Sequence, residues 1–542
     1  MGIPTLLYVL ALAARLVLVA LFPDPAYPDS YYYTDVARAL ATGHGLSVDF
    51  IWIFAEVGGG IPSDPTLPIP SNAHWMPLAS FVQVPFIAVL GPTAFASALP
   101  FALIGAIAAP LCWAIAREAG ASPAVAFAAG ILTAIPALSL VFMPQPDNFS
   151  LFQPLAVGAL WMAARGLKGH PRSFVLGGLL VGLATMSRND GVLLAATFGL
   201  AVLYDRWRAW RAGGGRAPAI PAWAAVAALV LFLLAVGPWW LRQLEVFGSL
   251  SPSAATGRVL YIRSIDEWNS ITTPANLDSF LGQGAGPLVA SRIGGLIAAA
   301  LIYTTLVGAG LLVPLMAIGG WARRRSRDFG PFFAYAGLLF AFSALVSAVH
   351  VPGGTFIHSA VALVPHSYIL AVEGIAVGVA WTAARRRSWN PAGATRIFTT
   401  AAVVFALFAA VASAVSVHAG WDRKREARSA VAVALDAAGA GMNDRILSID
   451  AAGMRYATGR GGVVTPNDPL DTIESVARAY GTRWLVLERD DIVAPLAPVL
   501  LGQSRPSWIG RPIFRAYAPP RPGPEIALYP VCVTATDDRC GS

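Results

Sequence analysis

Apolar stretches of about 20 residues recur along most of this chain, and they restrict its fold more than any other feature. Such a stretch can cross the roughly 30 Å of a bilayer's hydrocarbon core as a helix, in which every backbone polar group is bonded internally. Charged residues make up only 13% of the sequence, against about 25% in ordinary soluble domains. We therefore predict a polytopic α-helical membrane protein.

The length criterion predicts about eleven spans. The first, at 5–22, is interpreted as a retained span and not a cleaved signal peptide, because Arg15 interrupts it and no small-residue cleavage site precedes Pro23. Residues 77–91 are apolar but short, and are predicted to form an interfacial or re-entrant helix. The spans are expected at 5–22, 94–116, 123–143, 149–165, 173–187, 190–205, 222–241, 293–320, 331–349, 359–382 and 396–418.

Basic residues gather in the short gaps between apolar stretches, and this pattern predicts the topology. Lys and Arg in short loops mark the cytoplasmic side of a membrane protein. The N-terminus is thus predicted to be cytoplasmic, whereas loops 23–93 and 242–292 and the tail from 419 lie outside. The net charge of +8 follows from this arrangement and argues against a nucleic-acid partner. The clusters are Arg165, Lys168 and Arg172; Arg206, Arg208, Arg211 and Arg216; Arg323, Arg324, Arg325 and Arg327; and Arg385, Arg386 and Arg387.

The composition changes after residue 418, where charged residues return. The segments DRILSID, IESVARAYG and RWLVLE are typical of a strand, a helix and a second strand. We therefore predict a transmembrane domain at 1–418 and a small extracytoplasmic α/β domain at 419–542. Outside the cytoplasm a disulfide between Cys532 and Cys540 is expected, and two free thiols are the alternative.

Several polar residues at predicted span ends are candidates for function, because charged groups at membrane depth are costly and loops placed by a rigid scaffold carry most catalytic residues. All fall on the predicted outer side. Two further cations lie in the long loop 242–292. The candidates are Asp29, Asp147, Arg188, Asp190, His350 and His358, with Arg258 and Arg263 in the loop.

Each candidate also has a structural explanation. Asp29 would be a good N-cap for a helix that starts near Tyr31, and Asp147 for the fourth span. Arg188 and Asp190 would form an ion pair in a tight turn, and the histidines would be ordinary interface residues. The three tyrosines at 31–33 fit an aromatic belt. The acids Asp35, Asp49 and Glu56 are interpreted as solvated loop charges.

Four segments together resemble the GT-C membrane glycosyltransferases, in particular the protein O-mannosyltransferase and aminoarabinose transferase group (glycosyltransferase family 39-like). They are PDSYYYTDVARALATGHGLS, SNAHWMPLASFVQVPFIAVLGPTAF, MPQPDNFSLFQPLAVGALW and GLATMSRNDGVLLA. The tail resembles the periplasmic α/β domain of bacterial members. Two positions depart from the group's pattern. Asp29 is followed by Ser30, not by a second acid, which argues against a divalent-metal site, and Arg188 stands where Lys is usual.

The resemblance implies a glycosyl transfer at the outer face of a bacterial cytoplasmic membrane. The donor would be a sugar on a polyprenyl phosphate, and the acceptor a hydroxyl of a lipid, glycan or protein. Asp29 matches the position of the catalytic acid and would act as general base, and Asp147 matches the second acid. Arg188 would hold the donor phosphate through its planar fork. The other substrate-binding candidates are Tyr33, His74, Asp190, Arg258, Arg263 and His358. No cofactor is certain.

Two other functions remain open at this point. A transporter or flippase of a lipid-linked substrate would need polar sites near the bilayer midplane and two similar halves, and the sequence has no repeat. A non-enzymatic assembly protein would use the α/β tail to bind a partner and would not need acids that converge. A converging arrangement of the candidates would favour transfer.

Overall fold

The computed structural model describes residues 2–213, 217–250, 257–346, 354–386, 388–518, 521 and 523–532. Contacts divide the chain into two compact units. The helical unit comprises Met1–Asp24, Trp75–Arg242 and Val289–Val417; the α/β unit comprises Pro25–His74, Gln243–Leu288 and His418–Ser542. The α/β unit thus includes two stretches that the linear division at 418 assigned to the transmembrane domain, and each unit is described by itself.

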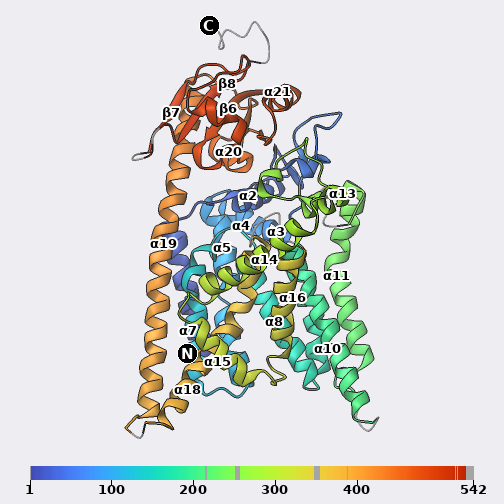
Figure 1. Cartoon of the computed structure of the whole chain (residues 1–542), viewed down its shortest axis with the longest axis vertical. Coiled ribbons are helices and arrows are strands. Elements are labelled where there is room, and N and C mark those ends of the chain that lie inside the picture. The colour runs from blue at the N-terminus through green and yellow to red at the C-terminus, as the bar shows by residue number, and fades with distance from the viewer. Residues whose placement is uncertain are drawn as a thin grey trace. The chain divides into compact units, whose positions relative to one another are not determined.

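Helices make up nearly all of the helical unit (Figure 1). Within the described residues, six helical segments are long and apolar enough to cross a membrane, which bears out the predicted class. The helices are α1 (Ile3–Leu21), α3 (Leu78–Phe81), α4 (Val84–Leu90), α5 (Ala94–Gly105), α6 (Ala108–Glu118), α7 (Pro123–Ala134), α8 (Phe149–Leu167), α9 (Pro171–Ser187), α10 (Val192–Arg211), α11 (Ala222–Phe247), α14 (Ala285–Ile302), α15 (Val313–Arg323), α16 (Gly330–Leu345), α17 (Gly354–Ser359), α18 (Val364–Ala383) and α19 (Pro391–Ala437).

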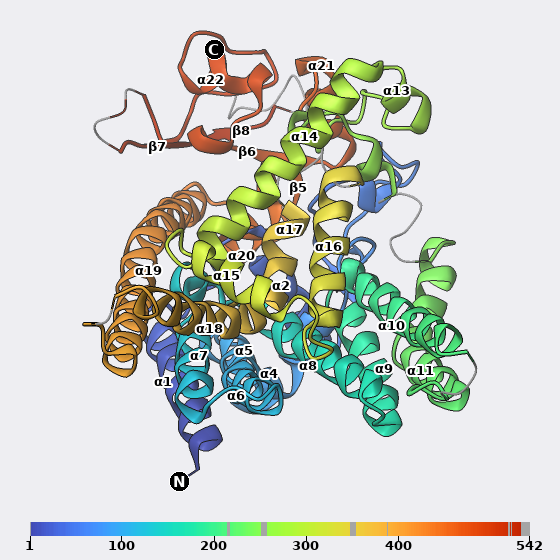
Figure 2. The same ribbon diagram turned by 60° about the horizontal axis from the view of Figure 1, so that its bottom comes forward.

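Glycines allow these helices to approach closely. A Cβ at Gly178 of α9 would lie 2.1 Å from the backbone oxygen of Ala228 in α11, and a Cβ at Gly319 of α15 would lie 1.9 Å from that of Leu370 in α18. Small residues at such crossings let helix backbones pack directly, which is the main source of helix association where lipid replaces water. Helices α8, α9, α10 and α11 lie side by side in Figure 2.

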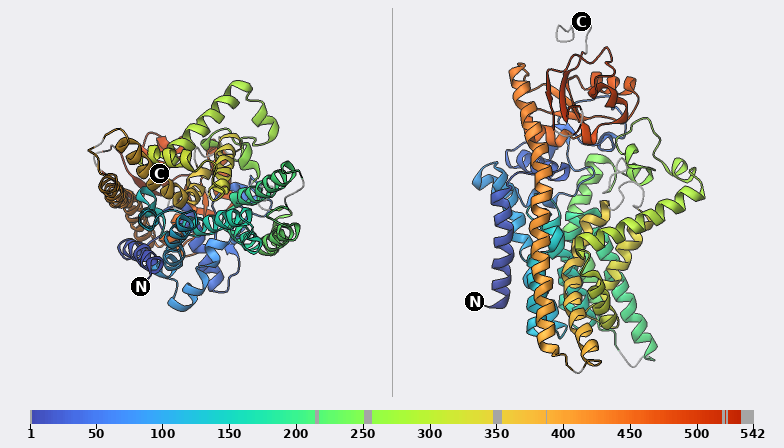
Figure 3. Two further views of the ribbon diagram at one scale, coloured as in Figure 1. Left: turned by 90° about the horizontal axis from the view of Figure 1, so that it is seen from below. Right: turned by 60° about the vertical axis from the view of Figure 1, so that its left-hand side comes forward.

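Three predicted spans differ from the structure. The span at 123–143 is the helix α7, which ends at Ala134, followed by a 3-10 helix at Ala137–Phe142. The span at 293–320 is two helices, α14 and α15, separated by a π-helical turn at Tyr303–Val307 and by residues with positive φ at Ala309 (44°) and Gly310 (71°). The apolar stretch is continuous in sequence, but its glycines allow the turn. The last span does not end at 418, because α19 continues as one helix to Ala437 (Figure 3).

One contact in the helical unit agrees with the predicted threading. Lys168, which follows α8, donates to Asp328 at 2.5 Å and to Glu118 at 2.7 Å. Asp328 lies between α15 and α16. The loops that carry the basic clusters at 165–172 and 323–327 therefore lie at the same end of the unit, as the threading requires.

The α/β unit is built on a six-stranded sheet in the order β2-β5-β4-β6-β8-β7 (Figure 1). The first four strands are parallel to one another. Strand β8 is antiparallel to both of its neighbours, β6 and β7. The strands are β2 (Phe50–Ile51), β4 (Arg445–Ser448), β5 (Gly462–Val464), β6 (Thr482–Glu488), β7 (Phe514–Ala516) and β8 (Ile526–Pro530), with a separate pair of β1 (Ser47–Val48) and β3 (Ile69–Pro70); the helices are α2 (Pro28–Ala41), α13 (Leu277–Leu281), α20 (Ala451–Thr458), α21 (Leu470–Ala479) and α22 (Ala497–Leu500).

Alternation along the strands places helices on both faces of this sheet. In β6, Leu485 and Leu487 join the cluster that contains Ile473 of α21, whereas Trp484 and Val486 face the cluster that contains Val431 of α19. This period of two is what a strand covered on both sides requires. The predicted strand, helix and strand correspond to β4, α21 and β6, so the small sheet region is confirmed. The segment after β4 forms α20 and β5, which these three segments did not predict.

Candidate functional site

The turn between α9 and α10 holds a buried ion pair. Arg188 ends α9 in an extended conformation (φ −150°, ψ 138°), and Asn189–Gly191 form one 3-10 turn before α10 begins. The Arg188 Nε donates to Asp190 Oδ1 at 2.8 Å, with 12% and 4% of the two side chains exposed. The structural explanation for this pair is therefore present, and it does not exclude a role in binding.

Two other segments contact the same arginine. Its Nε also donates to the Ser359 hydroxyl oxygen at 3.0 Å, and its Nη1 donates to Asn148 Oδ1 at 3.3 Å. The Ser359 hydroxyl in turn donates to the Asp190 carboxylate. Three segments that lie 40 to 171 residues apart in sequence thus meet around one guanidinium. Sequence reasoning missed Ser359 and Asn148, because neither neutral residue has a local signal.

Asp147 lies beside this cluster and is fully buried. Its Oδ1 accepts the backbone N–H of Asn148 at 2.5 Å, and its Oδ2 lies 3.6 Å from Nδ1 of His358. The His358 ring stacks on Phe149, with centroids 4.5 Å apart and planes at 21°. Asn148, not Asp147, is the N-cap residue of α8. The capping explanation for Asp147 is thus wrong, and its carboxylate accepts a backbone N–H and lies beside a histidine.

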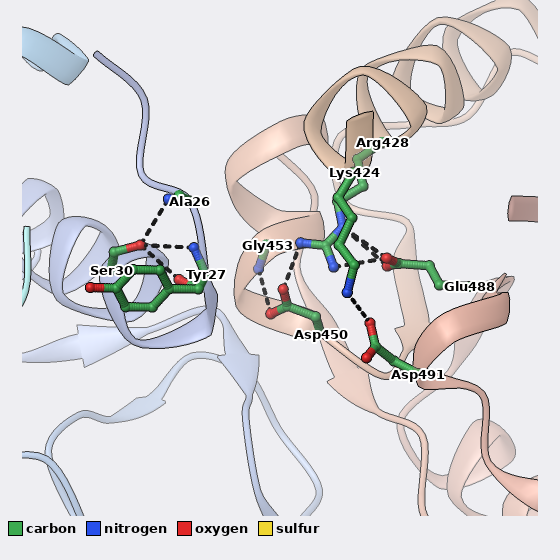
Figure 4. A network of polar contacts seen from close by, with 9 residues as sticks. All are labelled: Ala26, Tyr27, Ser30, Lys424, Arg428, Asp450, Gly453, Glu488 and Asp491. Carbon is green, nitrogen blue, oxygen red and sulfur yellow. Dashed lines mark hydrogen bonds and ion pairs between the residues drawn. The ribbon is translucent and has the colours of Figure 1, made fainter. Parts of the chain in front are cut away.

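Asp29 lies in the α/β unit, in the first turn of α2. The helix begins at Pro28, so Asp29 is its second residue and not its N-cap. The cap interaction is made by Ser30, whose hydroxyl oxygen accepts the backbone N–H groups of Ala26 at 3.0 Å and Tyr27 at 3.1 Å (Figure 4). The N-cap explanation for Asp29 is therefore wrong. Its carboxylate can interact favourably with the helix dipole, worth about 0.3–1 kcal/mol.

The tyrosines after Asp29 are packed inside the protein and do not form an aromatic belt. Tyr31, Tyr32 and Tyr33 are at most 3% exposed. The hydroxyl of Tyr32 accepts the Asn72 N–H at 2.7 Å, and its ring lies edge-on to Tyr33. Tyr31 packs on Tyr456 of α20, with centroids 5.2 Å apart. These rings fix α2 in the α/β unit, and a role of Tyr33 in substrate binding stays a prediction.

A second buried arginine network lies in the α/β unit, and sequence reasoning missed it. Arg428 of α19 binds Asp450 at 2.6 Å and Glu488 at 2.9 Å (Figure 4). Its guanidinium lies 5.9 Å from the centre of the Tyr31 ring. Asp450 also caps α20 by accepting the Gly453 N–H at 2.9 Å. Asp450 and Glu488 are the last residues of the segments DRILSID and RWLVLE, which were predicted as strands. An acid at the end of a strand is the sequence feature that could have identified both residues.

Two acids that were interpreted as solvated loop charges are not solvated. Glu56 is 7% exposed, and burial raises its pKa to about 7. Burial likewise raises the pKa of Asp35 to about 7, although Arg38 and Arg455 act in the opposite direction. Desolvation disfavours the charged form of a carboxyl group when no cation compensates it fully. Both acids lie in the α/β unit, outside the predicted spans.

The remaining predicted site residues have contacts within the α/β unit. His74 packs edge-on against Trp268, with centroids 6.2 Å apart. Arg258 donates to the carbonyl of Gly59 at 2.9 Å; Gly59 has a φ of 81°, and a Cβ there would overlap the guanidinium. Arg263 pairs with Glu267 at 2.7 Å. These contacts leave their proposed roles untested.

Two expectations fall on positions that are not described. His350 and Cys540 lie outside the described residues, so the predicted pairing of Cys532 with Cys540 stays a prediction. Cys532 itself is 7% exposed at the end of the sheet region.

Solved structures with the same architecture show the fold class of this chain. ArnT from Cupriavidus metallidurans bound to undecaprenyl phosphate matches with a TM-score of 0.57 at 13% identity, covering 99% of each chain. The Archaeoglobus fulgidus oligosaccharyltransferase, in a complex with Zn and sulfate, matches with a TM-score of 0.54 at 15% identity, covering 88% of this chain and 67% of that one. The chain has the same fold as these proteins, the GT-C fold.

The sequence comparison agrees with this class. Residues 71–241 match the family described as dolichyl-phosphate-mannose-protein mannosyltransferase. The matched region includes Asp147, Arg188 and Asp190. No curated protein sequence matches the chain.

Proposed function

We propose that this protein is a membrane glycosyltransferase that moves a sugar from a polyprenyl-phosphate donor to an acceptor hydroxyl at the extracytoplasmic face of a bacterial cytoplasmic membrane. The observation that carries the proposal is the meeting of Asp147, Arg188, Asp190 and His358, from three distant segments, at helix ends of a GT-C fold. ArnT, bound to undecaprenyl phosphate, and the mannosyltransferase family support a lipid-linked donor.

The proposed reaction is a substitution at C1 of the sugar. The acceptor oxygen attacks C1, its proton passes to the Asp29 carboxylate, and the bond from C1 to the phosphate oxygen breaks. The polyprenyl phosphate leaves with the electron pair of that bond. Arg188 stabilises the negative charge on the phosphate, because a guanidinium offers several donors to one anion. Asp147, which accepts a backbone N–H and lies beside His358, orients sugar or acceptor.

The direct test is a transfer assay with purified protein in lipid nanodiscs. A panel of polyprenyl-phosphate sugars is supplied with lipid, glycan and peptide acceptors, and release of polyprenyl phosphate is measured together with sugar transfer. We expect one donor to be consumed. If every donor remains intact, the proposal is wrong. In a parallel assay with the protein in sealed vesicles, movement of an intact donor across the bilayer would make the protein a transporter.

Asp29→Asn tests the proposed base. The change keeps the side-chain size but removes the charge, so transfer should fall about 10²- to 10⁴-fold, the range for general acid–base catalysis. Donor affinity and the thermal midpoint should stay close to wild type, because loss of the helix-dipole interaction costs at most about 1 kcal/mol. Asp64→Asn, at an exposed loop carboxylate, is the matched control. A fully active Asp29→Asn protein would contradict the role.

The proposed extracytoplasmic position of the α/β unit is tested with two variants, each of which carries one introduced cysteine. Ser504 of the α/β unit and Ser388 between α18 and α19 are both exposed. In intact spheroplasts an impermeant thiol reagent should label Ser504→Cys but not Ser388→Cys, and lysis should expose both. The opposite pattern would reverse the topology. Mass mapping of the labelled peptide separates these sites from the native cysteines.

A further inference from the structure

An apolar groove lies among α9, α10 and α11, helices that adjoin one another in Figure 2. Its volume is about 410 Å³, within the usual range of about 300–1,000 Å³ for ligand pockets, and its lining is almost entirely apolar. Phe174, Phe198 and Phe232 form its buried floor, and Leu203 and Leu229, more than half exposed, form its open rim. A groove of this composition on membrane helices fits a hydrocarbon chain.

Glycines create this space. A Cβ at Gly177 would lie 2.5 Å from the Phe198 ring, and Gly178 allows the close approach of α11. The absence of a side chain at both positions therefore lets Phe198 and α11 pack directly against α9. Gly199 is different, because a Cβ there would meet nothing within 4 Å. Gly199 lines the groove and keeps it unfilled.

On α9 and α11 the groove lies toward the helix end that is remote from Arg188. Its lining comes from 174–181 of α9, 195–203 of α10 and 225–232 of α11, so on α10 it covers the first half and the middle of the helix. Along α9, at about 1.5 Å per residue, Phe174 lies roughly 21 Å and Val181 roughly 10 Å before Arg188. The groove is therefore separate from the proposed phosphate-binding cluster.

Basic and aromatic residues follow the groove directly on α10, and we call them the girdle: Tyr204, Arg206, Trp207, Arg208, Trp210 and Arg211. The groove residues on this helix, Ala195, Phe198, Gly199, Val202 and Leu203, follow the spacing of three and four that defines one helix face, and Arg206 comes next on that face. Helical side chains lean toward the helix N-terminus, which for Arg206 is the direction of the groove.

Arg206 differs from its neighbours on α10 in having no partner among the residues that the structure describes. Arg208 and Arg211 lie over the rings of Tyr204 and Trp207, at 5.7 and 4.6 Å. Among the described residues Arg206 makes no hydrogen bond or ion pair. Tyr204, Trp207 and Trp210 are all exposed, as expected of rings at a membrane interface.

We propose that this groove binds an anionic phospholipid from the leaflet opposite the Arg188 turn, with one acyl chain in the groove and the headgroup phosphate on Arg206. The charge of Arg206 and the girdle select an anionic headgroup, since basic sites between membrane helices bind such lipids. The polyprenyl donor is disfavoured as the occupant, because its phosphate belongs at the other helix end. The site is independent of the proposed transfer reaction.

Lipid binding to the detergent-purified full chain tests the site. Native mass spectrometry would compare dioleoyl-phosphatidylglycerol with dioleoyl-phosphatidylcholine, which carry identical chains. Wild type should prefer the anionic lipid. Arg206→Ala should lower affinity for phosphatidylglycerol about 10-fold and remove the preference, as expected for loss of a charge-assisted contact. Arg208→Ala, on another face of α10, is the matched control and should change neither.

A second test of the same proposal fills the groove with a larger side chain. Gly199→Leu should weaken binding of both lipids about 10-fold, whereas Gly337→Leu, at an exposed helical glycine of α16 with equal space, should not. A diazirine in the acyl chain of phosphatidylglycerol should label α9, α10 or α11 in wild type and not in Gly199→Leu. Unchanged binding in both Arg206→Ala and Gly199→Leu would overturn the proposal. Displacement of phosphatidylglycerol by polyprenyl phosphate would overturn it too and make the donor chain the occupant.

Discussion

Arg188 in the helical unit and Arg428 in the α/β unit are both arginines held beside buried carboxylates, but their partners differ. Arg428 binds two carboxylates, from α20's cap residue and the end of β6. Arg188 binds the Asp190 carboxylate, and its other contacts include a hydroxyl and an amide oxygen. A buried arginine with two carboxylates is an element of the fold, whereas neutral partners make Arg188 the better candidate for an anionic substrate.

The electrostatics of the two clusters supports this difference. Asp450 and Glu488 together carry more negative charge than Arg428 offsets, and burial raises the pKa of Glu488 despite the adjacent guanidinium. Adding an anion there would be unfavourable. The contacts of Arg188 with Ser359 and Asn148 are made to neutral oxygens, with which an added phosphate competes for the guanidinium. Substitutions can test whether this distinction between a structural and a binding arginine holds.

The largest expected effect is on stability, from Arg428→Ala. Removing the guanidinium leaves the buried charges of Asp450 and Glu488 uncompensated, and loss of one partner of a buried ion pair costs about 3–5 kcal/mol. The thermal midpoint of the full chain should fall accordingly. Lys424→Ala removes the exposed pair with Asp491, in which 39% and 41% of the side chains are exposed, and should cost at most about 1 kcal/mol.

A triple variant sharpens the same test. Arg428→Met with Asp450→Asn and Glu488→Gln removes all three charges together, and should recover much of the stability lost in Arg428→Ala, because no unpaired charge remains. If Arg428→Ala keeps the wild-type midpoint but abolishes donor binding, the assignment of the two arginines is reversed.

Arg188→Ala is expected to act mainly on binding. Loss of a charge-assisted hydrogen bond is worth about 1.5–3 kcal/mol, so donor affinity should fall roughly 10- to 100-fold, and Arg188→Lys should recover part of it. The measurement is titration of a polyprenyl-phosphate sugar. Asp190→Asn is the informative companion, since it removes the competing carboxylate and should leave donor affinity at or above wild type. Equal loss of stability and unchanged donor affinity in both variants would make the pair purely structural.

The smallest effect concerns Glu56, a buried carboxyl group in the α/β unit whose raised pKa makes stability depend on pH. Its folded-state pKa is about 7, above the ordinary 4.5. Its contribution is therefore fully present below about pH 4.5 and is lost as the pH rises through 7. Glu56→Gln should raise the free energy of unfolding at pH 8 by roughly 1–3 kcal/mol and change it little at pH 4.5.

Thermal midpoints across this pH range provide the measurement for Glu56. Asp35 has the same direction of shift, so Glu56→Gln should flatten the pH dependence only in part. Parallel profiles for wild type and Glu56→Gln would mean that Glu56 is ionised throughout.

The candidate site was predictable where the residues are charged and stand at span ends. Asp147, Arg188, Asp190 and His358 were identified in this way, and the structure brings these four together. Ser359 was not, although it contacts both Arg188 and Asp190. A serine in an apolar sequence has no pattern of its own, and its importance depends on a contact made across 171 residues.

The sequence by itself determined the membrane class, the helical regions and the polar turns, because these depend on local hydropathy and on the length needed to cross a bilayer. Only the tertiary structure decided where α14 breaks from α15, that residues 50–51 join the C-terminal sheet, and which arginine meets which carboxylate. Periodicity records which face of an element is buried, but not its partner. The partner is fixed by packing between distant segments, where a glycine such as Gly178 decides how closely two helices approach.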